Sequence, residues 1–206
     1  MVCYNYSITF SPPIFIIMIE TSTIIEALYY ILKKIKKADK IKLVKLMYLS
    51  DKYHLIRYGR TVTNDDYYAM EHGPVGTTIK DVLSFDSFNM STKAFKYAST
   101  LLEKVDKNNF RAKPDASDVF DMLSDTDKEA LDFVINKFGK MRQWELRDYT
   151  HQYPEWYQYE DLFKNKQTKS ERIDTRELLS TLKDDPLKMP RKHVKESEKI
   201  LTGKFD

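Results

Sequence analysis

The sequence predicts a mainly α fold of the α+β class, a compact multi-helix domain with a small antiparallel β-hairpin or sheet in its middle. Apolar residues recur at helical spacing over residues 24–35, 44–56 and 131–138, as in amphipathic helices. Between these helices, residues 67–110 have a shorter period and a Gly-Pro break, as strands and turns do. With 206 residues, of which 42% are hydrophobic, the chain is long enough to bury one core.

Composition excludes several classes of protein. Cys3 is the only cysteine, which rules out an internal disulfide, a Cys-based zinc cluster and a CxxC site, so we expect a reducing, cytoplasmic location. The five glycines do not form a GxGxxG or Walker loop, and we expect no cofactor. The longest apolar run near the N-terminus, residues 14–19, is far short of the roughly 20 residues that span a bilayer, so we expect no membrane partner.

Residues 1–20 are interpreted as an N-terminal extension. They contain no Lys or Arg, which a signal peptide requires, and Pro12-Pro13 would break a helix across them. Met18 stands directly before the first clear helix, so one interpretation is that translation starts there and residues 1–17 are not part of the protein. The alternative is that residues 8–19 form a strand packed on the domain.

Two amphipathic helices are predicted at the start of the domain, which we place at residues 21–163. Thr23 and Glu26 have the spacing of a capping box, which would open the first helix. The second helix begins near Asp39 and ends at Gly59, because glycine favours the left-handed conformation found at helix ends. Asp51 falls on the apolar stripe of this second helix, where a carboxylate needs a partner.

The middle of the domain predicts a strand, a turn and a short helix. Residues 67–70 have strand character, and residues 72–76 (HGPVG) break it sharply. Thr77 or Thr78 would cap the helix that follows.

A hairpin and more helices are predicted in the second half of the domain. Residues 93–114 lack clear helix signals and fit a hairpin that turns at residues 107–109. Ser124 and Asp127 have the spacing that opens a helix, and Gly139 ends it.

A last short helix, with Pro154 at its first position, closes the domain. Residues 164–206 are polar and contain Pro186 and Pro190. We expect this C-terminal tail to be loosely attached, or to become ordered against a partner.

Charge is unevenly spread although the formal net charge is only +3. Residues 33–45 hold seven lysines against Asp39, and residues 115–132 hold six Asp and Glu129 against Lys128. Such segregation steers an oppositely charged partner or simply marks solvated helix faces, and we favour the second interpretation. A Lys-rich nucleic-acid-binding protein is one alternative, although only eight of the 34 basic residues are Arg, the side chain that reads phosphate and guanine.

Few side chains offer catalytic chemistry. Asp51 and His54 lie side by side at i and i+3 of the second helix. With His72 and His151 they would form an acid/base or metal cluster if the fold brought them together, which is the basis of a second alternative, a hydrolase or nuclease. No HExxH or similar spacing is present, and a hydrogen-bonded structural histidine is more common, so we expect no catalytic residue and no metal site.

Three segments carry a resemblance to a known family. Residues 45–60 (KLMYLSDKYHLIRYGR) resemble the "KLLYLAD…H…RYGR" opening of the Panacea domain of the SocA-like antitoxins. Residues 68–75 (YAMEHGPV) resemble its "Y-x-A-x-x-x-GPV" signature, and Thr150-His151 followed by Trp156 resembles its closing "(S/T)H…W" element. The matches fall in the expected order over residues 41–160, with Ser50 standing where the family usually has Ala.

The resemblance implies an antitoxin of a bacterial or phage toxin–antitoxin pair, which binds and neutralises a cognate protein toxin. Panacea domains accompany many unrelated toxins, so the domain does not name its partner. Neutralisation would proceed by masking or, as in the SocA case, by delivery to a ClpXP-type protease. The resemblance also implies a second role, in which the protein binds its own promoter DNA. The sequence contains no separate helix-turn-helix for this role.

Under this resemblance, the motif residues form either a scaffold or a partner-binding surface, with specificity from a Tyr-rich face and from the charged segments. The candidate residues are Tyr48, Asp51, Arg57, Gly59, Arg60, Tyr68, His72, Gly73, Pro74, Val75, Thr150, His151 and Trp156.

Overall fold

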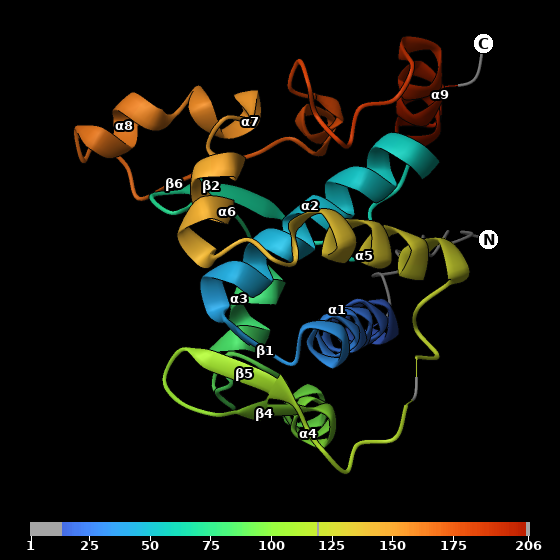
Figure 1. Cartoon of the computed structure of the whole chain (residues 1–206), viewed down its shortest axis with the longest axis vertical. Coiled ribbons are helices and arrows are strands. Elements are labelled where there is room, and N and C mark those ends of the chain that lie inside the picture. The colour runs from blue at the N-terminus through green and yellow to red at the C-terminus, as the bar shows by residue number, and fades with distance from the viewer. Residues whose placement is uncertain (1–13, 119, 205–206) are drawn as a thin grey trace, which may run out of the picture.

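The helix α2 (Lys40–Tyr58) lies at the centre of the protein (Figure 1). The computed structural model describes residues 14–118 and 120–204, with side chains described from residue 21 onward. Within this part of the chain, every side chain of α2 from Leu43 to Ile56 is buried. Three long or central neighbours pack against it, namely α1 (Ile14–Ile35), α5 (Asp125–Phe138) and α6 (Gln143–Thr150). The remaining helices are α3 (Thr77–Ser84), α4 (Thr92–Leu101), α7 (Pro154–Tyr157), α8 (Glu160–Lys164), the 3-10 helix η1 (Thr175–Leu179) and α9 (Arg191–Thr202).

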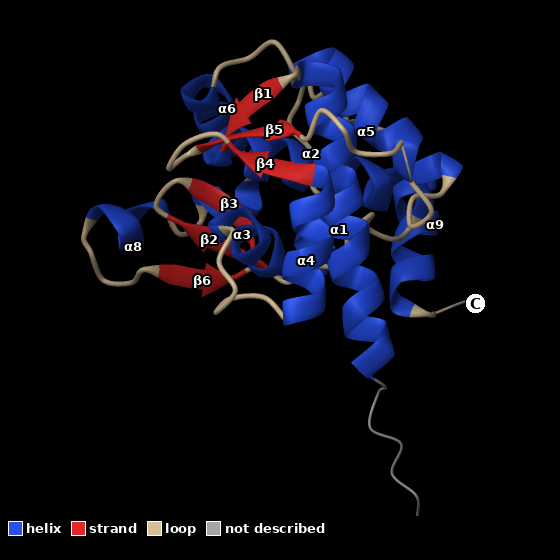
Figure 2. Ribbon diagram, turned by 90° about the horizontal axis from the view of Figure 1, so that it is seen from below, coloured by secondary structure: helices blue, strands red, loops and turns tan. Residues whose placement is uncertain are grey.

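Two small antiparallel sheets lie to one side of the long helices, as Figure 2 shows. One sheet has the order β1-β5-β4 and the other the order β3-β2-β6, so the prediction of a mainly α fold with a small central sheet is confirmed. In the second sheet, Tyr68 is paired with Val75 on one side and with Arg172 on the other. The strands are β1 (Lys37–Asp39), β2 (Tyr67–Met70), β3 (Gly73–Gly76), β4 (Leu102–Lys104), β5 (Asn109–Ala112) and β6 (Ser170–Arg172).

The predicted ends of α2 are confirmed. The Asp39 carboxylate accepts a hydrogen bond from Lys42 N at 3.1 Å and so caps the helix. At the other end, Gly59 has φ +76°, and its N–H donates to Leu55 O. A Cβ at Gly59 would lie 2.6 Å from Ile200 Cβ, so both the backbone conformation and the packing of α9 require glycine there.

The predicted start of the first helix is wrong. The helix α1 begins at Ile14, and Thr23 and Glu26 lie inside it instead of forming a capping box. The Glu26 carboxylate accepts hydrogen bonds from Tyr97 OH at 2.6 Å and from Met122 N at 2.9 Å, so it binds distant segments. Residues 14–19 are helical, not a strand, and our expectations for residues 1–13 lie outside the described residues.

Two local predictions in the middle of the chain also need correction. Residues 92–101 form the helix α4, capped by Ser91, and only the strands β4 and β5 form the predicted hairpin. The buried Ala94, Ala98 and Leu101 have helical spacing, a signal that the nearby aromatic residues obscured. The N-cap residue of α3 is Gly76 instead of a threonine, and the Asp65 carboxylate accepts from Thr78 N and Ile79 N in its first turn at 3.0 and 2.9 Å.

Two helix starts in the second half of the chain are confirmed. Ser124 and Asp127 form a reciprocal capping box at the start of α5. Pro154 occupies the first turn of α7, where its missing N–H has no helical partner to lose.

The C-terminal segment packs closely on the body, so the expectation of loose attachment is wrong for residues 170–202. The strand β6 extends the sheet through β2, and Leu178 and Leu187 are fully buried. From α9, Ser197 Oγ donates to Ile56 O and His193 Nε2 donates to Arg57 O, each at 2.7 Å. These bonds satisfy carbonyls at the C-terminal end of α2, which a helix leaves without partners. The polar tail therefore belongs to the folded unit, while the domain boundary at residue 163 stays a prediction.

The opposed charged segments meet at the surface of the protein. Lys33 and Asp118 form an ion pair at 2.7 Å, and Lys34 and Asp132 form one at 3.3 Å. The lysines of residues 33–45 are therefore partly neutralised by the acidic segment that follows β5. No helix in the described part of the chain is long and apolar enough to cross a membrane.

Replacing Leu178 by Ala tests whether the C-terminal segment contributes to the fold. Leu178 is fully buried, so the cavity should lower the free energy of unfolding by about 2–5 kcal/mol. Urea unfolding followed by circular dichroism measures the change. Lys195→Ala, an exposed position on α9, is the control and should be neutral. Equal stability of both variants would show that residues 170–202 detach without cost.

Candidate functional site

The buried polar side chains of α2 organise the motif segments around it. Lys45, Asp51, Lys52 and His54 are each at most 1% exposed. Burying such groups is costly unless each has a hydrogen-bond or charge partner. Their partners come from different segments of the chain, so α2 decides where those segments lie.

Asp51 holds the loop that follows α2. Its Oδ1 accepts from Val62 N at 2.9 Å and from Thr63 N at 3.0 Å. Its Oδ2 accepts from the Thr63 hydroxyl and from Tyr67 OH, the latter at 2.8 Å. Burial raises the pKa of Asp51 to about 7, against the lowering effect of the hydrogen bonds from Thr63 and Tyr67. The predicted need for a partner is thus confirmed, and the partners are backbone and hydroxyl donors.

Lys52 forms a buried ion pair with Glu155 of α7. The distance from Lys52 Nζ to Glu155 Oε1 is 2.5 Å, and both side chains are fully buried. Tyr48 OH donates to the same oxygen at 2.5 Å, and Ser180 Oγ donates to Glu155 Oε2 at 2.6 Å. Lys52 also donates to Leu178 O at 3.0 Å, so the pair connects α2, α7 and the C-terminal segment.

Lys45 lies seven residues before Lys52 on α2 but has a different environment. Its Nζ donates to Pro74 O at 2.8 Å, and no carboxylate of the described residues lies within 4.0 Å of it. Burial lowers the pKa of Lys45 well below its ordinary value. The bond to Pro74 fixes the HGPVG turn on α2.

Gly73 and the closing motif pack at this same place. Gly73 has φ +99°, and a Cβ on it would lie 2.6 Å from Lys45 Nζ and 3.1 Å from His151 Cδ2. His151 stacks on Trp156, with ring centroids 3.5 Å apart at 11°. Trp156 Nε1 donates to Met70 O at 2.7 Å, which fixes the end of β2. The first, second and third motif segments therefore form one packed unit.

His151 sits in this unit as an uncharged ring. Burial lowers its pKa to about 4, and the positive charge of Lys45 adds to the effect. Its Nε2 is buried without a hydrogen-bond partner among the described residues.

The structure does not bring Asp51, His54, His72 and His151 together. His54 Nδ1 donates to Arg60 O at 2.7 Å, and its Nε2 lies 3.0 Å from Thr126 Oγ1 on the opposite element α5. Burial lowers the pKa of His54, as expected for a neutral structural histidine. His72 is exposed at the turn after β2, with its ring 6.0 Å from that of Trp144. His151 is hydrogen-bonded to the backbone of His72, but Asp51 and His54 have partners in other segments, so the four side chains do not form the cluster on which the hydrolase or nuclease hypothesis rests.

The remaining candidate residues have structural contacts. Arg57 pairs with Glu129 at 3.1 Å, and Arg60 pairs with Asp127 at 2.9 Å, so both connect α2 to α5. Thr150 is fully buried and donates to the backbone of its own helix. No group of three His, Cys, Asp or Glu side chains in the described residues is arranged to hold a metal ion.

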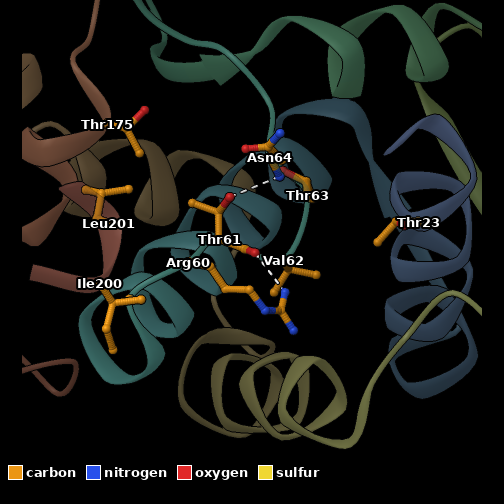
Figure 3. A pocket seen from close by; sticks show the side chains of 10 residues that line it. Thr23, Arg60, Thr61, Val62, Thr63, Asn64, Thr175, Ile200 and Leu201 are labelled. Carbon is orange, nitrogen blue, oxygen red and sulfur yellow. Dashed lines mark hydrogen bonds between the residues drawn. The ribbon is translucent and has the colours of Figure 1, made fainter. Parts of the chain in front are cut away.

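A pocket of about 460 Å³ lies between the loop after α2 and the helix α9 (Figure 3). Thr61 lines it, and its Oγ1 accepts from Asn64 N at 3.0 Å while its carbonyl accepts from Arg60. Ile200 and Leu201 of α9 form another wall. Of the described residues that line this pocket, Arg60 alone is ionisable, and it is already paired with Asp127.

Comparison with known proteins agrees with this motif-based unit. The family model described as "Antitoxin SocA-like, Panacea domain" matches residues 43–157, more than half of the chain. The chain belongs to this family. No curated protein and no solved structure matches the chain. The Panacea match runs from α2 to α7 and includes Lys45, Asp51, Lys52 and Glu155.

Sequence analysis did not single out Lys52, Glu155 or Asp65. Lys45 and Lys52 occur on a helix whose apolar residues surround them, which is the signal that identified Asp51. Applied to every polar residue of α2, the same argument predicts their burial. The partners Glu155 and Ser180 lie more than 100 residues away, and no local spacing indicates them.

Replacing the two buried lysines by Met should have unequal effects on stability. Lys52→Met leaves the Glu155 carboxylate buried without its counter-ion and should cost about 3–5 kcal/mol. Lys45→Met leaves only the Pro74 carbonyl without a donor. It should lower the free energy of unfolding by at most about 3 kcal/mol. Urea unfolding at pH 7 measures both. Equal losses of stability in the two variants would contradict the assignment of Glu155 as a counter-ion of Lys52 and not of Lys45.

Asp51 should make stability fall as the pH rises. Between its ordinary pKa of 3.8 and its folded value of about 7, the folded protein holds a proton that the unfolded chain has lost. The wild type should therefore lose up to about 4 kcal/mol relative to Asp51→Asn between pH 4 and pH 8. Unfolding of both proteins across this range measures the difference. A difference independent of pH would show that Asp51 is ionised throughout.

Proposed function

We propose that this protein is an antitoxin that binds a cognate protein toxin and neutralises it by direct contact. Its membership of the SocA-like antitoxin family is the observation on which the proposal rests. The described chemistry supports a binding role, because the candidate acid/base groups are dispersed and are held in structural contacts. The toxin itself is expected to be the product of an adjacent gene.

Most motif residues support the toxin-binding surface from within instead of touching the toxin. Tyr48, Asp51, Thr150 and Trp156 are at most 3% exposed, so a partner cannot reach their side chains. Two motif residues, Arg60 and His72, are exposed, and His72 lies at the β2–β3 turn beside the exposed Trp144.

Trp144 is the side chain around which we place the contact surface. It is 45% exposed, and the Arg147 guanidinium lies 4.9 Å from the centre of its ring. Trp and Arg are the residue types most enriched among interface residues that dominate affinity. The surface formed by His72, Trp144 and Arg147 is named here the turn surface.

Co-expression with the product of the adjacent gene tests the function. We expect the neighbouring product to arrest growth, and this protein to restore growth and to copurify with the toxin. A toxic neighbour that is neither rescued nor bound would contradict the proposal.

A host without the ClpXP-type protease separates masking from delivery. Masking predicts that rescue persists in this host together with a stable complex. Loss of rescue would instead favour the adaptor mechanism. Binding to the chain's own promoter DNA would appear separately, as a mobility shift that weakens steeply with salt.

Trp144→Ala should weaken toxin binding without unfolding the protein. Removing an aromatic anchor at the centre of an interface typically costs about 2 kcal/mol or more, about 30-fold in Kd. Titration calorimetry with the copurified toxin measures the loss. Phe88→Ala is the matched control, because Phe88 is 95% exposed and lies outside the turn surface. Equal affinities of the two variants would place the interface elsewhere.

A further inference from the structure

A groove of about 280 Å³ opens beside the HGPVG turn, at the N-terminal end of α2. Its walls are mainly apolar, with Ile41 and Val44 from α2, Met70 from β2 and Val75 from β3. The helix α3, which contacts both α2 and β3, adds Lys80 to the rim, and Figure 2 shows β2, β3 and α3 close to one another. The groove is adjacent to the turn surface, because His72 lines it as well.

The rim of the groove is positively charged. Lys40, Lys80 and Lys169 line it against a single acid, Glu71. No carboxylate of the described residues lies within 4.0 Å of any of these three lysines, in contrast to Lys33 and Lys34. Burial lowers the pKa of Lys40, and the nearby charges of Lys104 and Lys107 add to the effect. An anionic partner would reduce the electrostatic repulsion between these positive side chains.

A fourth lysine also lines the groove. Lys45 lines the groove and is 1% exposed. Its buried equivalent on the same helix, Lys52, has the Glu155 carboxylate at 2.5 Å, whereas Lys45 has only the Pro74 carbonyl. Among the residues that the structure describes, Lys52 therefore has a counter-ion and Lys45 has none.

We infer that this groove binds a segment of the toxin in which an apolar side chain is flanked by carboxylates. The apolar side chain fills the space between Val44 and Val75, and the carboxylates pair with the lysines of the rim. Apolar walls favour a peptide over a phosphate backbone, and the lysines supply charge without the bidentate geometry of Arg. This inference rests on the proposed function, because it names the chemistry of the partner that the antitoxin would recognise.

A small-molecule probe tests the groove without the toxin. 3-Phenylpropionate has an apolar ring and a carboxylate, and 3-phenylpropionamide has the same shape without the charge. In ¹H–¹⁵N correlation spectra we expect the carboxylate to shift the amide signals of Val44 and Val75, with at least tenfold weaker binding of the amide. Equal binding of both compounds, or shifts confined to other residues, would overturn the inference.

Charge reversal on the rim tests the same groove with the toxin. The double variant Lys80→Glu/Lys169→Glu changes two exposed side chains, and we expect at least tenfold weaker toxin binding with unchanged thermal unfolding. Lys195→Glu on α9, which packs at the other end of α2, is the control and should bind as the wild type does. Unchanged binding by the double variant would overturn the inference and leave the proposed function standing. If the wild type itself does not bind the toxin, the proposed function fails, and the probe experiment decides the chemistry of the groove.

Discussion

The burial of α2 on every side is the constraint on which the rest of the structure depends. A helix covered on one face can turn its polar side chains to water, but α2 has buried residues all around from Leu43 to Ile56. Its polar side chains therefore need partners inside the protein. Asp51 finds them in the following loop, Lys52 in α7 and Lys45 in the β3 strand. Each polar contact fixes the position of one segment relative to α2, which hydrophobic packing alone does not specify.

This arrangement gives a physical meaning to the Panacea motif. The motif residues of α2 and their partners form a scaffold, whose buried ion pair and hydrogen bonds specify one packing of the three motif segments. Gly73 belongs to that scaffold as well, since a side chain there would displace Lys45. In the proposed function, this buried network is the support, and the exposed residues around the HGPVG turn make the contacts with the toxin.

Local signals predicted much of the fold, and long-range contacts account for the errors. The ends of α2, the capping box of α5 and the position of Pro154 follow from residues within one or two turns, and all were predicted correctly. The capping box at Thr23 and Glu26 failed because Glu26 binds Tyr97 and Met122 instead of its own backbone. The tail was misjudged because three of its apolar residues, Ile173, Leu178 and Leu187, are buried in the core although they are far apart in a polar sequence. For the site, the spacing of residues on α2 predicted that Asp51 needs a partner. It could not predict that Glu155, far away in the sequence, is the partner of Lys52.

The distribution of charge shows why composition alone misleads about partners. Two lysines of the longest basic segment form ion pairs with the longest acidic segment, so part of the charge of both segments is neutralised within the fold. The lysines around the groove are fewer and come from three separate segments, and no local count of charge reveals them. In the inferred binding mode, the apolar walls of the groove lower the effective dielectric and strengthen the attraction between each lysine and an anionic partner. A binding surface of this kind depends on tertiary structure, because only the fold brings Lys40, Lys80 and Lys169 to one rim.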